Sequence, residues 1–264
     1  MSNVFDFIGK KWDDIHNMSK DGFDNEKEIL GAINGKKFVE LNANLQTFIK
    51  DIFNFDVVCD DIISCEELGG INKPDIKVIF CGEIRHVSIK KGSGNSMHQE
   101  KLSDFIPFLN QKYSASIGIK NDVALFIWGD GTFDGSGNIS SRLGATQFAV
   151  NYMEEIVELK VFFKEHKREL LKRFVIKGIK NGPSVDYIYY GTVEEGYWIT
   201  AENAIDWLCE EEHEAKGVIA VGGLTFQAWN RNIKGIDRFE NRRGQIQLKW
   251  GAIGKDIKNI SENL

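Results

Sequence analysis

Apolar residues recur at helical spacing in three parts of the chain. Between residues 36 and 53 they occupy one face of a predicted helix: Phe38, Leu41, Leu45, Phe48, Ile49 and Ile52. A second helix is expected from Ser96, because Gln99 three residues later completes a capping box and an apolar stripe follows. Residues 152–174 predict a third helix, which is long and highly charged.

Other apolar runs are short and rich in β-branched or aromatic residues, which is typical of strands. Residues 76–81 and 84–90 form two such runs, and Gly82-Glu83 between them predicts a turn, so we expect a hairpin. The run VALFIW at residues 123–128 is apolar enough for a central strand. Further short strands are expected at residues 218–221, 224–229 and 245–250. The pattern predicts an α/β fold with a mixed central β-sheet flanked by helices.

The domain organisation follows from the absence of a linker. The 264 residues include only three prolines, and no low-complexity tract or repeat interrupts them. We therefore expect a single domain over residues 1–264, with a core over about residues 30–175 and a C-terminal subdomain over about residues 176–264.

Composition and charge narrow the class of protein. Hydrophobic residues make up 42% and charged residues 27%, and no apolar run is long enough for a membrane span, so no membrane partner is expected. The N-terminus has no signal-peptide core, which predicts a cytoplasmic protein. The scattered cysteines predict buried, reduced side chains and no zinc site. The net charge is −6, but basic residues outnumber acidic ones at residues 84–120 and 224–264, where phosphate groups could bind.

The stretch from Asn72 to Glu100 carries the candidate chemistry. Asp75 enters the first strand of the predicted hairpin, and Ser88 and Lys90 share one face of the second strand because side chains alternate. A Gly-rich loop then leads to the predicted helix, whose first turn carries Glu100. Two carboxylates and a lysine at one strand edge suit Mg²⁺-assisted phosphodiester hydrolysis, because carboxylates hold the metal and the lysine orients a water.

The order Pro74-Asp75, strand, Ser88-Ile89-Lys90 resembles the PD-(D/E)XK signature of many Type II restriction endonucleases. The departure is Ser88, where the signature expects an acid. Some restriction enzymes have this departure and supply the acid from the following helix, so the resemblance implies that Glu100 joins Asp75 as a metal ligand. Related nucleases often place a helix glutamate beside the metal, which makes Glu40 a secondary candidate. The resemblance implies a restriction-endonuclease-like core with a C-terminal DNA-recognition subdomain.

Other interpretations of these residues stay open. Asp75 could be a turn residue, Lys90 a solvated strand end and Glu100 an acid favoured by a helix N-terminus. Ser88 as a nucleophile would need a His-Asp pair, which is not evident in the sequence. The loop KKGSGNS is not GxxxxGK[ST], so we expect no nucleotide cofactor. In the nuclease interpretation this segment lies near the DNA, with the candidate contacts Lys91, Ser93, Asn95 and His98.

The C-terminal region is rich in side chains that read bases. Arg pairs bidentately with guanine, and Asn or Gln with adenine, in the major groove. A polar, solvated β-surface is the alternative interpretation. The candidates are Gln227, Asn230, Arg231, Asn232, Lys234, Arg242, Arg243, Gln245, Gln247 and Lys249.

Three functions are consistent with these residues. The first is a homodimeric Type II restriction endonuclease that cuts double-stranded DNA at a short site with Mg²⁺ and leaves 5′-phosphate ends. The second is a repair or junction-resolving nuclease of the same fold, and the third is a DNA-binding protein without catalysis. The density of base-reading side chains favours the first, because structure-selective nucleases rely more on phosphate contacts.

Overall fold

The chain forms two compact units. The computed structural model describes residues 21–54, 60–70, 72–93, 95–229 and 242–263. Internal contacts group Met1–Asn95, Ile176–Ala204 and Ala252–Leu264 into a first unit, and Ser96–Val175 and Ile205–Gly251 into a second unit. The chain therefore crosses between the units four times, near residues 95, 175, 204 and 251. The single domain with a boundary near residue 176 stays a prediction.

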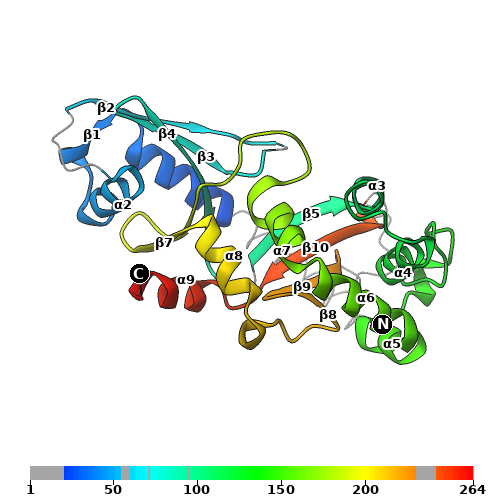
Figure 1. Ribbon diagram of the computed structural model, residues 1–264. Coiled ribbons are helices and arrows are strands. Elements are labelled where there is room, and N and C mark those ends of the chain that lie inside the picture. The colour runs from blue at the N-terminus through cyan, green and yellow to red at the C-terminus, as the bar shows by residue number, and fades with distance from the viewer. Residues whose placement is uncertain (1–20, 55–59, 71, 94, 230–241, 264) are drawn as a thin grey trace, which may run out of the picture. The chain divides into compact units, whose positions relative to one another are not determined.

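The first unit is built on a six-stranded mixed sheet in the order β1-β2-β3-β4-β6-β7 (Figure 1). The pair β4 and β6 is parallel, and the other neighbours are antiparallel. The mixed central sheet predicted from the sequence is thus confirmed. The strands are β1 (Lys36–Lys37), β2 (Ile62–Glu67), β3 (Ile76–Phe80), β4 (Glu83–Lys90), β6 (Tyr187–Gly191) and β7 (Gly196–Thr200).

The predicted hairpin is formed by β3 and β4. Burial alternates along β3, and Ile76 lies opposite Val87 in the antiparallel register. The turn is at Cys81-Gly82, one residue earlier than predicted, and both residues have positive φ (50° and 78°). Positive φ at both central residues is the geometry of a type I′ turn, whose twist matches that of the strands.

Helices cover both faces of this sheet. On α2 (Ala43–Phe53), Phe48 meets the rings of Tyr189 and Trp198 at 4.9 and 5.3 Å. Lys258 of α9 (Ile253–Glu262) lies over Tyr197, on the opposite face because side chains alternate along β7. A further helix over residues 21–33 adds to the core packed on the α2 side.

The predicted helix over residues 36–53 begins later than expected. Its first residues form β1 and a short 3₁₀ turn, η1 (Phe38–Glu40). The α-helix begins only after Asn42, whose side chain accepts a hydrogen bond from the Leu45 N–H at 2.9 Å. The cap stops the helix from extending backwards, because it satisfies one of the orphan donors at that end.

The second unit contains a four-stranded sheet in the order β5-β10-β9-β8, packed with helices. Phe226 of β9 is central to its core and contacts the rings of Phe105, Phe126 and Phe163. The three C-terminal strands confirm the prediction. The elements are β5 (Asn95–Lys101), α3 (Leu102–Tyr113), α4 (Ile117–Trp128), α5 (Ala145–Asn151), α6 (Met153–Glu165), α7 (Lys167–Leu171), π-helix η3 (Lys172–Lys177), η4 (Glu211–His213), β8 (Ile219–Val221), β9 (Leu224–Ala228) and β10 (Gln245–Trp250). Helix α8 (Ala201–Cys209) runs from the first unit into the second.

Two predicted elements of the second unit were wrong. The apolar run at residues 123–128 is not a strand but the end of α4, whose residues 122–127 are all buried. A helix buried on every side has no polar face, so its sequence looks like that of a central strand. Ser96 does not cap a helix, because residues 95–101 form β5 and α3 begins at Leu102. The expected capping pair exists as a side-chain hydrogen bond from Gln99 to Ser96 at 3.1 Å.

Two further findings concern membranes and thiols. Among the described helices, none has both the length and the apolar composition of a membrane span.

Cys65 is free and buried, as predicted, and Cys209 is free and partly buried. Cys81 departs from the prediction, because it is exposed and disulfide-bonded.

Candidate active site

Asp75 lies at the start of β3, in the middle of the first unit's sheet. Its backbone N–H donates to the Val87 carbonyl at 2.9 Å, and its carbonyl accepts from the Leu68 N–H at 2.9 Å. These bonds connect it to β4 on one side and to the end of β2 on the other. Its position is therefore fixed by the sheet rather than by a mobile loop.

The hairpin brings Asp75, Ser88 and Lys90 together, as the alternation of side chains predicts. Oδ2 of Asp75 accepts three hydrogen bonds, from Ser88 Oγ at 3.0 Å, Ile89 N at 2.6 Å and Lys90 Nζ at 3.0 Å. Among the described residues none donates to Oδ1. The side chain of Asp75 is 22% exposed, so one carboxylate oxygen is held by the protein and the other can accept a ligand.

Lys90 and Ser88 have different surroundings. The Lys90 ammonium also donates to its neighbour's carbonyl, Ile89 O, at 2.8 Å, which fixes its position beside Asp75. Ser88 is buried and donates its hydroxyl proton to Asp75. No described histidine accepts that proton, so the contacts do not form the Ser-His pair that a nucleophilic serine requires.

A glutamate that was not predicted from the sequence interacts electrostatically with this group. Glu26 lies on the helix over residues 21–33, which is tied to the sheet by Asn25 (Nδ2 to Gly191 O, 2.9 Å) and by Asp21 (Oδ1 to Lys91 Nζ, 3.0 Å). Burial and the neighbouring carboxylate of Asp75 raise the pKa of Glu26 to about 7, against the effect of Lys90. Glu26 is therefore close enough to Asp75 and Lys90 to interact with both.

Lys73 adds a second cation beside Asp75. Burial and the nearby Lys90 ammonium lower its pKa to about 7, although Asp75 acts in the opposite direction. Two carboxyl groups that repel each other and two ammonium groups that repel each other thus share one part of the first unit. A divalent cation and a phosphate group would relieve both repulsions.

The residues present fit a hard divalent cation. Mg²⁺ is usually bound through one or two carboxylates, with waters and substrate phosphates completing its shell. Asp75 offers the open Oδ1, and the Glu26 carboxyl makes no hydrogen bond to any described residue. These oxygen donors match Mg²⁺ better than a metal that prefers nitrogen or sulfur.

The predicted metal ligand Glu100 is sealed inside the second unit. It lies on β5 rather than in the first turn of a helix, and its side chain is fully buried. Arg173 donates to both oxygens, Nε to Oε1 at 3.1 Å and Nη2 to Oε2 at 2.6 Å, and His98 Nε2 lies 3.3 Å from Oε1. Burial alone would raise its pKa, but the hydrogen bonds from His98 and Arg173 lower it.

The secondary candidate Glu40 is placed differently from its prediction. It lies in the 3₁₀ turn η1, is exposed, and accepts a hydrogen bond from the Lys37 N–H at 2.7 Å. No contact between described residues connects Glu40 with Asp75. The helix glutamate that interacts electrostatically with Asp75 is instead Glu26, fourteen residues earlier.

The predicted DNA contacts near the hairpin are split between the two units. Lys91 pairs with Asp21, Ser93 is exposed, and Asn95 Nδ2 donates to Gly92 O at 2.7 Å. His98 is buried beside Glu100. Ser93 is thus open to a ligand, whereas the imidazole of His98 is part of the second unit's interior.

The C-terminal candidates also differ in exposure. Gln227 and Gln247 lie opposite each other on β9 and β10 and share a hydrogen bond of 2.9 Å. Arg242 is exposed over the Trp229 ring, whereas Arg243 pairs with the buried Asp130 at 2.7 Å. Gln245 donates to Gln99 at 3.3 Å, and Lys249 is partly exposed on β10. The remaining candidates Asn230, Arg231, Asn232 and Lys234 lie outside the described residues.

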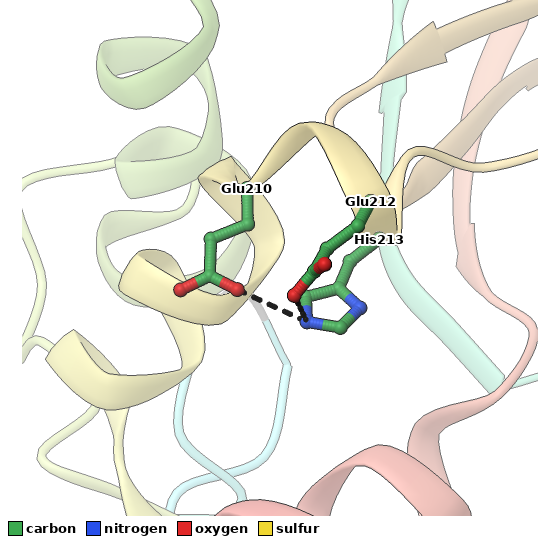
Figure 2. Close-up of side chains that lie close together, drawn as sticks. All are labelled: Glu210, Glu212 and His213. Atoms are coloured by element: carbon green, nitrogen blue, oxygen red, sulfur yellow. Dashed lines mark ion pairs between the residues drawn. The ribbon is translucent and has the colours of Figure 1, made fainter.

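A separate cluster in the second unit consists of Glu210, Glu212 and His213 (Figure 2). It is the only set of three potential ligand atoms within 4.8 Å among the described residues. Both glutamates are exposed and lie 3.1 and 3.5 Å from His213 Nε2, whose ring stacks on Trp207 at 3.6 Å. The stacking and two ion pairs account for this arrangement as a surface contact of η4.

The similarity of this chain to a known protein lies in its fold and not in its sequence. No protein-family model and no curated protein matches the sequence. The structure is similar to the crystal structure of restriction endonuclease MspI in complex with its cognate DNA, with a TM-score of 0.56 at 13% sequence identity. The similarity covers 94% of this chain and 97% of that chain. The chain has a restriction-endonuclease-like fold. The fold that the sequence resemblance implies is therefore confirmed.

Proposed function

We propose that the protein is a Mg²⁺-dependent endonuclease that hydrolyses double-stranded DNA at the Asp75 hairpin. The observation that carries the proposal is the Asp75 carboxylate, with Oδ2 held by Ser88, Ile89 and Lys90 and Oδ1 open. This arrangement lies in the central sheet of a restriction-endonuclease-like fold, and the similar structure, MspI, is bound to its cognate DNA.

Asp75 and Glu26 would hold the metal. A bound Mg²⁺ supplies positive charge to the scissile phosphate and lowers the pKa of a coordinated water. The protein's part is to present two carboxylates that repel each other until a cation lies between them. The raised pKa of Glu26 supports this role, because a nearby divalent cation reverses the balance that favours the neutral acid.

Lys90 would orient the attacking water and stabilise charge on the phosphate. Its ammonium is fixed by two hydrogen bonds, to Asp75 Oδ2 and Ile89 O, and it is 14% exposed. A preorganised cation of this kind acts on charge that develops during the reaction, without the cost of reorienting at that moment.

Glu100 remains the competing candidate for the second metal ligand. To bind a metal it would have to release Arg173 from one or both oxygens. A buried arginine without its acid costs several kcal/mol, of the order of 3–5. We therefore favour Glu26 as the second carboxylate and assign Glu100 to the packing of β5 against η3.

The proposed function also includes a specific cleavage site, the chemical nature of the products and an oligomeric state. We infer cleavage at a specific short site, with 5′-phosphate products and a homodimer that matches the symmetry of such a site. Support for base reading comes from the exposed Arg242 and from the partly exposed Gln227 and Gln245, which are the side-chain types that contact guanine and adenine edges. Gln247 is buried and gives no such support. A junction-resolving nuclease would use the same Asp75 site, but it would not need these base contacts.

Digestion of plasmid DNA of known sequence tests the proposal. Purified protein with Mg²⁺ should give discrete bands, and the ends should be ligatable without prior phosphorylation, which identifies 5′-phosphates. Asp75→Ala should abolish cutting, whereas Asp24→Ala, at an exposed position of the helix over residues 21–33, should cut like the wild type. A smear or cutting confined to junctions would indicate the second function. Binding without any cutting, in every divalent metal tried, would contradict the nuclease assignment.

A further inference from the structure

The two edge strands of the first unit's sheet differ in how well they are protected against pairing with another strand. At one edge β1 has only two residues, Lys36 and Lys37. At the other edge β7 has five residues, Gly196–Thr200, whose sequence GYWIT contains no charge and no proline. Soluble proteins protect their edge strands by shortening them or by adding lysine, proline or a bulge. β1 has two of these protections, and β7 has none of them.

The other described edges are protected as well. In the second unit's sheet, β8 has three residues, and β5 ends in the exposed Lys101. β7 is therefore exceptional among the edge strands that the structure describes.

The hydrogen-bonding groups on the open side of β7 can be identified from its pairing with β6. Thr192 N donates to Glu195 O, and Ala201 N donates to Asp186 O. In an antiparallel pair the bonded residues alternate, so Tyr197 and Ile199 face β6, whereas the backbone groups of Gly196, Trp198 and Thr200 face outward.

Most of these outward groups have no partner in the described parts of the chain. The Gly196 N–H donates to Asn44 Oδ1 at 3.1 Å. The backbone N–H and C=O of Trp198 and the N–H of Thr200 make no hydrogen bond to a described residue. A hollow of about 470 Å³ runs along the strand, from Asp51 to Ser261, so the edge is accessible.

We propose that β7 is the surface through which two copies of this chain pair, antiparallel, across a two-fold axis at Trp198. The outward residues 196, 198 and 200 are symmetric about position 198. Trp198 and the partner subunit's Trp198 would exchange two N–H···O=C bonds, and each Thr200 N–H would reach the partner's Gly196 carbonyl. The two six-stranded sheets would become one continuous sheet.

Side chains and charge also favour a second copy of the chain. Under this symmetry the two Trp198 side chains are direct cross-strand neighbours, and Tyr197 lies opposite the partner's Ile199, which are favourable aromatic and β-branched pairs. No charged residue of the strand faces a like charge, because β7 contains none. At the other edge, the same operation would place lysines against lysines. The inference depends on the sheet edge and not on the proposed nuclease chemistry.

Sedimentation velocity with a pair of charge variants tests this arrangement. The wild type should sediment as a dimer of two 29.9 kDa chains at micromolar concentration. Trp198→Lys and Trp198→Glu should each sediment as monomers, because residue 198 faces itself across the axis. An equimolar mixture of the two should recover a dimer, since Lys then faces Glu. Lys37→Glu, a charge change at the opposite edge, should leave the wild-type dimer unchanged.

A second pair of variants avoids the packed Trp198 side chain. Thr200→Pro removes an outward N–H that the β6–β7 pairing does not use, and should weaken dimerisation by roughly tenfold or more. Thr200→Ala is the matched control, because it also loses the hydrogen bond between the Thr200 hydroxyl and Asn203 N but keeps the backbone N–H. A monomeric wild type would overturn the proposal, whatever the cleavage activity. Equal dimerisation of Thr200→Pro and Thr200→Ala, or a dimer that all the Trp198 variants keep, would also overturn it.

Discussion

Asp75 and Glu100 are both acids paired with a basic side chain, yet their surroundings differ in every other respect. Asp75 is partly exposed, and only one of its carboxylate oxygens is hydrogen-bonded. Glu100 is fully buried, and Arg173 bonds both of its oxygens. An acid in such a sequence motif can bind a metal only when the fold leaves one of its carboxylate oxygens without a hydrogen bond. On this basis we propose that the first unit carries the reaction and that the Glu100 cluster stabilises the second unit.

The largest expected effect concerns catalysis at Lys90. Lys90→Ala should lower the single-turnover cleavage rate by about 10²–10³-fold, because it removes a preorganised charge beside Asp75. Lys36→Ala is the control, since Lys36 is exposed on the edge strand β1 and should change the rate little. If the Lys90 variant loses only DNA affinity and keeps its rate, Lys90 is a phosphate contact and not a catalytic group.

The next effect concerns the stability of the second unit. Glu100→Gln should lower the free energy of unfolding by about 3–5 kcal/mol, because Arg173 would remain buried without its acid. Asp75→Asn should cost much less, since its side chain is partly exposed. Urea denaturation of both variants measures the difference. Equal losses of stability would remove the distinction between the two acids.

Variants of the neighbouring residues Arg242 and Arg243 test which of them contacts DNA bases. Arg242→Ala should reduce the discrimination between cognate and non-cognate DNA by about 1–3 kcal/mol, whereas a phosphate contact would weaken all sequences alike. Arg243→Ala should instead lower stability, because Arg243 pairs with the buried Asp130. Binding measured against both DNA types, with a thermal melt of each variant, separates these outcomes. Uniform weakening by Arg242→Ala would place that residue on the DNA backbone.

The smallest effect is a pH dependence of stability in the second unit. Burial, together with Glu158 and Glu155, raises the pKa of Asp122 from 3.8 to about 6. The folded chain therefore binds more protons than the unfolded chain in this window, and stability should fall as pH rises from 3.8 to about 6.

The variant Asp122→Asn isolates this contribution. It should be more stable than the wild type by about 1–2 kcal/mol well above pH 6, with no such gain at pH 4 or below. Asp24→Asn, the same substitution at an exposed position, is the control for the loss of one carboxylate. The same gain in the free energy of unfolding at both pH values would show that the pKa of Asp122 is not raised in the folded protein.

The hairpin could be predicted from the sequence because its information is local. Alternation along β4 places Ser88 and Lys90 on one face, and the turn between the strands is short, so the prediction required no knowledge of distant packing. The predicted strand at residues 123–128 was wrong because a helix buried on all sides has no polar face to reveal its period.

The partners of the two acids could not be predicted, because they come from distant parts of the chain. Glu26 approaches Asp75 through a helix held by Asn25 and Asp21, which bond to Gly191 and Lys91. Arg173 is 73 residues from Glu100. In the sequence, Glu26 is only an acidic residue ahead of the first predicted helix, which is a weak indication of a metal ligand.

Metal binding by three single variants tests whether Asp75 and Glu26 hold the cation. Titration of Mn²⁺, followed by its electron paramagnetic resonance signal, would compare Asp75→Asn, Glu26→Gln and Glu100→Gln with the wild type, after each is shown to be folded by circular dichroism. We expect Asp75→Asn and Glu26→Gln to lose most of the Mn²⁺ affinity, because each removes a carboxylate near Lys90. A folded Glu100→Gln should bind Mn²⁺ like the wild type. Loss of affinity in Glu100→Gln, with affinity retained in Glu26→Gln, would show that Glu100 and not Glu26 is the second metal ligand.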